Sequence, residues 1–183
     1  MTAMTQPLRK AVCVLLAVWL AVALSGCMTS EDYELQHISE TLSVDCPKER
    51  LMKKYDSHGG FLGDGTSFFV FSFEDDPQLQ TIRDSGKWKP FPVSDNVRDI
   101  LWSVGNPGDD DYSGPPLITK DGDERSLFPR VKNGYYFFRD RHSDAVDPYD
   151  DTHVFDESRY SFNFSVAVYD ADTDRLYYAE FDT

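Results

Sequence analysis

Hydrophobic and polar residues alternate strictly near the end of the chain, over residues 159–170. One face of an extended strand would carry Phe162, Phe164, Val166 and Val168, and the other Ser161, Asn163, Ser165 and Ala167. The aspartate-rich residues 170–174 are typical of a turn, and apolar residues return over 176–181. This period of two predicts an antiparallel hairpin with a core face.

Two further segments have the composition of buried strands. Residues 66–73 read Thr-Ser-Phe-Phe-Val-Phe-Ser-Phe, and residues 131–140 contain Tyr-Tyr-Phe-Phe. Aromatic and β-branched residues are enriched in strands. A third strand is predicted over 50–57, and the glycine-rich residues 58–65 would join it to the strand 66–73 as a hairpin.

Apolar spacing and capping residues predict the helices. A loose apolar stripe indicates a short helix over 33–42. Asp76-Pro77 predicts the start of a second helix that ends at Gly86, and Ser94 predicts the start of a third that ends at Gly105. The sequence therefore predicts an α+β fold of about five antiparallel strands, with two or three helices packed on one face.

The first residues of the chain have the order of a secretory signal. The basic pair Arg9-Lys10 precedes the apolar run 11–23 and then Leu24-Ser25-Gly26-Cys27. The run is shorter than the ~20 residues of a membrane-spanning helix. The last four residues resemble the lipobox of bacterial lipoproteins, whose cysteine is diacylated and becomes the N-terminus. The resemblance implies a signal peptide over 1–26, a lipidated Cys27 with a tether to residue 32, and one domain over 33–183 that faces outside the cytoplasm.

The chain is strongly acidic, with 18 Lys and Arg against 32 Asp and Glu and a formal net charge of −14. Such a surface repels nucleic-acid phosphate, so no nucleic-acid partner is expected. Cys13 would leave with the signal and Cys27 would be lipidated, so Cys46 has no partner for an intramolecular disulfide. Cys46 is expected to be a small buried hydrophobe, or alternatively an intermolecular thiol.

Carboxylates and histidines are concentrated in the segment 140–156. Its candidate metal ligands are Asp140, His142, Asp144, Asp147, Asp150, Asp151 and His153, followed by Asp156. Carboxylate oxygens suit calcium, and histidine with carboxylate suits a transition metal. The alternative is a solvated loop that keeps an exported protein soluble. The solvated loop is favoured, with a divalent cation as the alternative cofactor.

Two other motifs lack essential parts of known sites. The segment 58–65, His-Gly-Gly-Phe-Leu-Gly-Asp-Gly, lacks the lysine of a P-loop, and no Gly-x-Ser-x-Gly motif exists for an esterase mechanism. Asp170-Ala-Asp-Thr-Asp174 has the spacing of calcium ligands, but Arg175 and Phe181 stand where an EF-hand needs Gly and Glu. A tight turn and a hairpin turn are therefore predicted.

Several motifs resemble a group of bacterial proteins, many of which have lipoprotein signals. They are His-Gly-Gly-Phe-x-Gly-Asp-Gly-Thr at 58–66, Asn-Gly-Tyr-Tyr-Phe-Phe at 133–138, Arg-His-Ser at 141–143, Asp-Pro-Tyr-Asp-Asp at 147–151, and the stretch from Ser-Phe-Asn-Phe to Glu-Phe-Asp-Thr at 161–183. The resemblance covers nearly all of the predicted domain and supports its boundaries. It implies no activity, because none is assigned to that group.

Two functions follow from these patterns. The first is a membrane-anchored extracytoplasmic binding or interaction module, attached through Cys27, with an unknown small-molecule ligand or a protein partner at the cell surface. The second is a metal-binding protein or metal-dependent envelope hydrolase that uses the segment 140–156 and His58. The absence of a catalytic motif favours the first, whereas hydrolase activity that is lost on mutating His142 or His58 would favour the second.

Overall fold

The computed structural model describes residues 29–59, 63–105, 110, 113–120, 123–142, 147–156 and 159–183. The chain divides into two compact units, residues 1–34 and 35–183, and the second contains the entire β-sheet. The predicted signal peptide over 1–26 and Cys27 lie outside the described residues. Within the described ranges, no helix combines the length and the apolar character needed to cross a membrane.

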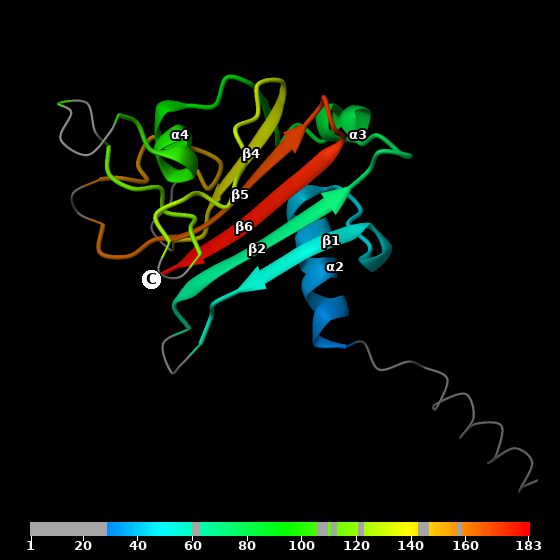
Figure 1. Ribbon diagram of the computed structural model, residues 1–183, viewed down its shortest axis with the longest axis horizontal. Helices are drawn as coiled ribbons and strands as arrows, with labels where there is room; N and C mark the ends of the chain where they lie inside the picture. The colour runs from blue at the N-terminus through cyan, green and yellow to red at the C-terminus, as the bar shows by residue number, and fades with distance from the viewer. Residues whose placement is uncertain are drawn as a thin grey trace, which may run out of the picture. The chain divides into compact units, whose positions relative to one another are not determined.

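Six antiparallel strands form one sheet with the order β1-β2-β6-β5-β4-β3 (Figure 1). They are β1 (Leu51–Asp56), β2 (Gly65–Ser72), β3 (Lys89–Pro90), β4 (Gly134–Asp140), β5 (Asn163–Asp170) and β6 (Arg175–Asp182). The last strand, β6, lies near the centre and pairs with both β2 and β5. The predicted α+β fold is confirmed, and so are the two predicted hairpins, β1–β2 and β5–β6. The sheet has six strands instead of about five.

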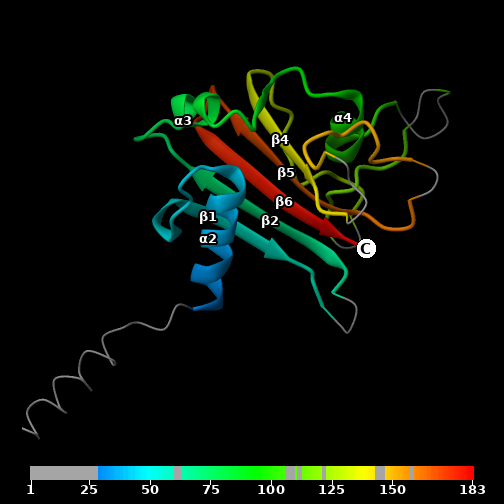
Figure 2. The same ribbon diagram turned by 180° about the vertical axis from the view of Figure 1, so that it is seen from behind.

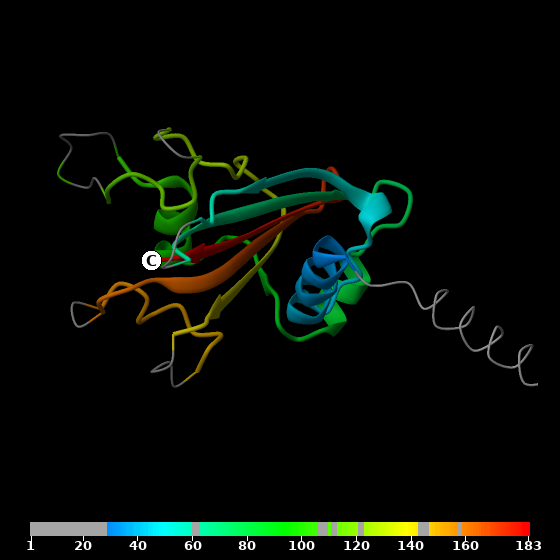
Figure 3. The same cartoon turned by 90° about the horizontal axis from the view of Figure 1, so that it is seen from below.

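Helices cover both faces of this sheet. α2 (Ser30–Leu42) and α3 (Leu79–Asp84) pack on one face, with Leu35, Ile38, Leu42 and Ile82 in a first core cluster. α4 (Asp95–Trp102) packs on the opposite face, with Val97, Ile100 and Leu101 in a second cluster. Figures 2 and 3 show α2 and α3 on one side of the sheet and α4 on the other. The expectation that the helices share one face is corrected accordingly.

Strand β5 gives the physical reason for this correction. Phe164, Val166 and Val168 face the second cluster, as the alternation predicts. The opposite face of the strand carries Ala167 and Tyr169, which belong to the first cluster and are 0% exposed. Since both faces of the strand are apolar at this end, each face needs its own cover.

The turn between β5 and β6 is a hairpin turn, as predicted. The N–H of Asp172 and the hydroxyl of Thr173 both donate to the carboxylate of Asp170, at 3.0 and 2.8 Å. Asp174 has a positive φ of 48°, and its carboxylate accepts a 2.5 Å hydrogen bond from the hydroxyl of Tyr169. These aspartates therefore hold the turn and the neighbouring strand in place.

Helix α2 begins earlier than the predicted residue 33. The hydroxyl of Thr29 accepts a hydrogen bond from the N–H of Asp32 (3.2 Å), and the carboxylate of Asp32 accepts one from the N–H of Thr29 (3.0 Å). This reciprocal capping box starts the helix at Ser30. Residues 30–32 of the predicted tether are therefore helical, and residues 27–28 lie outside the described residues.

Helix α3 begins later than predicted, at Leu79 instead of Asp76-Pro77. The N–H of Asp76 closes a turn onto the carbonyl oxygen of Phe73 (2.9 Å). Gln78 occupies the N-cap position, and its N–H donates to the hydroxyl of Tyr169 (3.2 Å). A contact with a strand 91 residues away therefore helps to set the start of this helix.

Cys46 is a free, buried cysteine of the first core cluster. Its side chain packs among apolar neighbours, and the residue is 1% exposed. Burial, with a smaller contribution from Asp45, raises the pKa of the thiol well above its ordinary value. Of the two predicted alternatives, the structure supports the small buried hydrophobe.

Gly134, at the start of β4, allows a close backbone approach. A Cβ at this position would lie 1.9 Å from the carbonyl oxygen of Tyr169 and 3.2 Å from Cε2 of Phe91. We expect Gly134→Ala to lower the free energy of unfolding by about 3 kcal/mol, the upper range for overpacking, because a backbone oxygen cannot rotate away. Urea denaturation followed by tryptophan fluorescence measures the change.

The matched control is Gly59→Ala. There the nearest atom to an added Cβ is the carbonyl oxygen of Ser57 at 3.8 Å, an ordinary contact distance. We expect the Gly59 variant to unfold at nearly the same urea concentration as the unmodified protein. Equal destabilisation by the two alanines would contradict the assignment of the effect to the Gly134 contact.

Candidate functional site

Asp140, at the end of β4, forms a buried ion pair. Two guanidinium nitrogens of Arg159 donate to its carboxylate oxygens at 2.6 and 2.7 Å, and the side chains are 6% and 8% exposed. The N–H of His142 also donates to Asp140 (2.9 Å). Burial alone would raise the pKa of Asp140, but the hydrogen bonds from Arg159 and His142 outweigh it and hold that pKa below its usual value. The carboxylate of Asp140 is therefore already bound by Arg159 and His142 of this chain.

Two of the following carboxylates accept hydrogen bonds from the backbone of the same loop. Asp147 accepts a hydrogen bond from the N–H of Tyr149 (2.9 Å), and Asp150 accepts one from the N–H of Thr152 (3.0 Å). Both are Asx turns, in which an aspartate binds the backbone two residues further on. These carboxylates therefore shape the loop through its own backbone.

The other candidate ligands of this segment form separate pairs. The carboxylate of Asp151 is buried, and it lies 3.5 Å from Nζ of Lys89. Nδ1 of His153 lies 3.0 Å from the carboxylate of Asp156. Asp144 lies outside the described residues. Within the part of the chain that the structure describes, no three histidine, cysteine or acidic side chains converge as a metal-binding group.

His58 contacts two carboxylates from different strands. Its Nδ1 lies 2.7 Å from Asp56 of β1, and its Nε2 lies 3.2 Å from Asp182 of β6. Arg141 donates to both oxygens of Asp182, at 2.9 and 3.0 Å. Because carboxylates only accept, both ring contacts are hydrogen bonds when the imidazole is doubly protonated. His58 thereby ties the start of the glycine-rich segment to the last strand.

This arrangement does not have the composition of a catalytic dyad. Among the described residues, no serine or threonine hydroxyl bonds to His58, whereas a nucleophile must lie within hydrogen-bond reach of its base. The neighbouring hydroxyl of Ser57 bonds to the backbone of Thr66 instead. Residues 60–62 of the glycine-rich segment lie outside the described residues.

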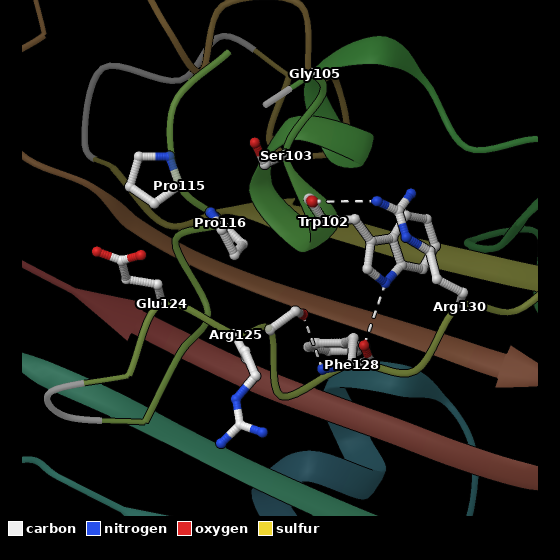
Figure 4. Close-up of a pocket in the computed structure, with 10 residues that line it drawn as sticks. Trp102, Ser103, Gly105, Pro115, Pro116, Glu124, Arg125, Phe128 and Arg130 are labelled. Carbon is white, nitrogen blue, oxygen red and sulfur yellow. Dashed lines mark hydrogen bonds between the residues drawn. The ribbon is translucent and has the colours of Figure 1, made fainter. Parts of the chain in front are cut away.

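Two adjoining cavities lie beside the end of α4, at Trp102. The first has a volume of about 360 Å³, and Figure 4 shows Pro115, Pro116 and Phe128 around it with Trp102 and Arg130. The second has a volume of about 500 Å³ and shares Trp102 and Arg130 with the first. Its other walls include Phe91, Pro92, Val93 and Lys132. Both volumes fall in the range of small-molecule sites.

Trp102 is the last residue of helix α4, and the helix places it beside the two cavities. The hydroxyl of Ser94 accepts a hydrogen bond from the N–H of Val97 (3.2 Å), so the helix starts where the sequence predicts. It ends at Trp102, before the predicted stop at Gly105, because Ser103 has a positive φ of 61°. The hydroxyl of Ser103 donates to a carbonyl oxygen of the following loop and stabilises this early end.

Trp102 and Arg130 contact each other through a hydrogen bond and a cation–π interaction. The indole N–H of Trp102 donates to the carbonyl oxygens of Phe128 (3.3 Å) and Pro129 (3.1 Å). Arg130 donates to the carbonyl oxygen of Trp102 (3.3 Å), and its guanidinium carbon lies 5.2 Å from the centre of the Trp102 ring system (Figure 4). This cation–π contact and the three hydrogen bonds fix both side chains between the two cavities.

The cations around the cavities differ in how they are neutralised. Arg98 and Arg125 form ion pairs with neighbouring aspartates at 2.7 and 2.8 Å. Within the described ranges, no carboxylate lies at ion-pair distance from Arg130 or Lys132. Two cations in a chain of net charge −14 are therefore not neutralised by a described carboxylate.

The sequence patterns did not single out Trp102, Arg130 or Lys132. Trp102 comes directly after the apolar positions that predict the third helix, and Arg130 follows 28 residues later. No periodicity relates residues this far apart through a loop. Comparisons with protein-family models, curated proteins and solved structures found no match for this chain.

Asp140→Asn should lower the free energy of unfolding by about 3 kcal/mol at pH 7, because it leaves the buried Arg159 without a counter-charge. Folding lowers the pKa of Asp140, so its stabilisation is present above the unfolded pKa of about 3.9 and is lost as the pH falls through the lower folded pKa. Urea denaturation at pH 7, 5 and 3 measures this dependence.

The difference in unfolding free energy between the unmodified protein and this variant should therefore be large at pH 7 and 5 and smaller at pH 3. Asp147→Asn is the control, because Asp147 is exposed and an asparagine can accept the same backbone hydrogen bond. A difference for the Asp140 variant that stays constant from pH 7 to pH 3 would refute the role of the carboxylate charge.

Proposed function

We propose that this protein is a membrane-anchored extracytoplasmic binding module whose ligand occupies the cavities beside Trp102. The observation that carries the proposal is the fixed Trp102–Arg130 pair between two adjoining cavities of ligand size. Ligand sites of proteins combine apolar walls with a few oriented polar groups, which this pair and the surrounding prolines and aromatics supply.

The hydroxyl groups near Trp102 favour binding over catalysis. The hydroxyl of Ser126 accepts a hydrogen bond from the N–H of Phe128 (3.0 Å), and the hydroxyl of Ser103 donates to the carbonyl oxygen of Gly114. Both therefore serve the local backbone, and neither has the histidine neighbour that activates a nucleophile. The ligand is a small molecule or a segment of a protein partner at the cell surface.

The anchor in this proposal is Cys27, and it rests on the resemblance of residues 24–27 to a lipobox. Two or more acyl chains give stable membrane attachment, since each buried methylene contributes about 0.8 kcal/mol. The alternative function, a metal-binding protein or metal-dependent hydrolase using residues 140–156, stays a prediction. The contacts of Asp140, Asp147 and Asp150 with protein groups favour the binding module.

Indole signals of the processed chain, which begins at Cys27 in this proposal, test the proposed site in detergent micelles. Trp19 leaves with the predicted signal peptide, so Trp88 and Trp102 give two ¹⁵N–¹H indole signals, assigned by Trp→Phe substitution. We expect at least one probe among benzoate, benzyl alcohol and benzylamine to shift the Trp102 signal in a saturable manner. Small aromatic probes suit the site, because both cavities have aromatic and proline walls.

Trp88 is the internal control for this titration. It is 7% exposed, belongs to the first core cluster on the opposite face of the sheet, and donates its indole N–H to Leu42 (3.0 Å). Its signal should stay in place while that of Trp102 moves. If none of the three probes shifts Trp102, or if the Trp88 signal moves in parallel, the proposed site is wrong.

Cys27→Ser tests the anchor. The unmodified chain should incorporate radiolabelled palmitate and sediment with membranes, and the Cys27 variant should do neither, because the acylated thiol is absent. Cys13→Ser is the matched control, since it removes a thiol from the same predicted signal segment. Palmitate labelling that survives in the Cys27 variant would show that the lipobox assignment is wrong.

A further inference from the structure

We infer that the ligand of these cavities is an organic carboxylate with an apolar body, bound through Arg130 and Lys132. The inference rests on the proposed function, because it names the chemical class of ligand for the same site. It follows from three features of the described residues: an oriented guanidinium, a second cation beside it, and apolar walls on both sides.

Arg130 is held by contacts that leave most of its donors available. A guanidinium has five N–H donors, and one terminal nitrogen of Arg130 bonds to the carbonyl oxygen of Trp102. The cation–π contact with the Trp102 ring orients the guanidinium plane without consuming an N–H. An arginine that is already oriented can bind a carboxylate with two parallel hydrogen bonds and loses little side-chain entropy.

Lys132 adds a second cation to the larger cavity. It lies two residues after Arg130 and lines that cavity together with it. Among the described residues, neither side chain has a carboxylate at ion-pair distance, in contrast to Arg98 and Arg125. Asp95 also lines this cavity, but its carboxylate pairs with Arg98 at 2.7 Å. Two neighbouring cations without an ion-paired carboxylate repel each other, and an anionic ligand removes this repulsion.

The residues that line the larger cavity indicate the chemistry of the uncharged part of the ligand. Phe91, Pro92, Val93 and Val131 line the larger cavity with Trp102. A small inorganic anion leaves such a surface in contact with water, whereas an apolar body covers it. A carboxylate carries one negative charge, so the acidic chain repels it less than a phosphate dianion.

The test compares ligands of one shape and different charge. Benzoate, benzyl alcohol and benzylamine share the same ring, and acetate carries the carboxylate without the ring. Dissociation constants come from titrations of the Trp102 indole signal of the processed chain. We expect benzoate to bind at least about tenfold more tightly than benzyl alcohol, the ratio expected for a charge-assisted hydrogen bond. Benzylamine and acetate should bind more weakly than benzoate.

Three variants assign this preference to particular side chains. Arg130→Gln should weaken benzoate binding about tenfold and leave the affinity for benzyl alcohol within about twofold. Lys132→Gln should weaken benzoate binding about threefold, and because this side chain is exposed, the variant keeps the test valid if the Arg130 variant misfolds. Arg83→Gln is the matched control and should have little effect, because Arg83 is an exposed residue of α3 on the opposite face of the sheet and lines neither cavity.

The outcomes separate the inference from the proposed function. If benzyl alcohol binds as tightly as benzoate, the cavity is a binding site but the carboxylate class is wrong. If phenyl phosphate binds more tightly than benzoate, the class is a phosphate and the inference is overturned. An equal loss of benzoate binding in the Arg83 and Arg130 variants would show a general charge effect and also overturn it. If no probe shifts Trp102, the proposed function itself fails.

Discussion

Burial of the central strand β5 on both of its faces is the constraint on which the rest of the structure depends. Every residue from Phe164 to Tyr169 is buried, and successive side chains point to opposite faces. A single helical layer cannot cover both faces, so α2 and α3 pack on one and α4 on the other. The position of α4 brings its last residue, Trp102, to the segment that contains Arg130. The cavities beside Trp102 are therefore a consequence of the two-sided core.

Gly134 connects this constraint to the wall of the larger cavity. The carbonyl oxygen of Gly134 accepts a hydrogen bond from the N–H of Phe91 (3.1 Å), and the Phe91 ring lies over the position that a Cβ would occupy. The same ring stacks on Tyr136 of β4 at a centroid distance of 6.5 Å. Because Phe91 also lines the cavity, one missing side chain serves strand pairing and the shape of the site together.

The sequence predicted the strands well because their side-chain period is local. The alternation over 162–168 and the aromatic run 66–73 each indicate a strand without knowledge of its neighbours. Features that depend on distant contacts were not predictable: the start of α3 involves a contact with Tyr169, and the site pairs Trp102 with Arg130 across 28 residues. The candidate ligands of the segment 140–156 drew attention through their density, but the described ones mainly contact nearby backbone and basic groups.

The overall charge and the local charge of this protein act over different distances. A net charge of −14 repels extended polyanions such as nucleic acids and anionic headgroup surfaces. This repulsion is short-ranged, because exposed charges are screened beyond about 8 Å at physiological ionic strength. In the proposed site, a small anion would lie beside Arg130 and Lys132, well inside the screening length. An acidic surface around these two cations would therefore select for ligand size as well as charge, because it repels anions that are too large to enter. If the domain is anchored through Cys27 as proposed, the same surface would repel anionic headgroups and disfavour an orientation flat on the membrane.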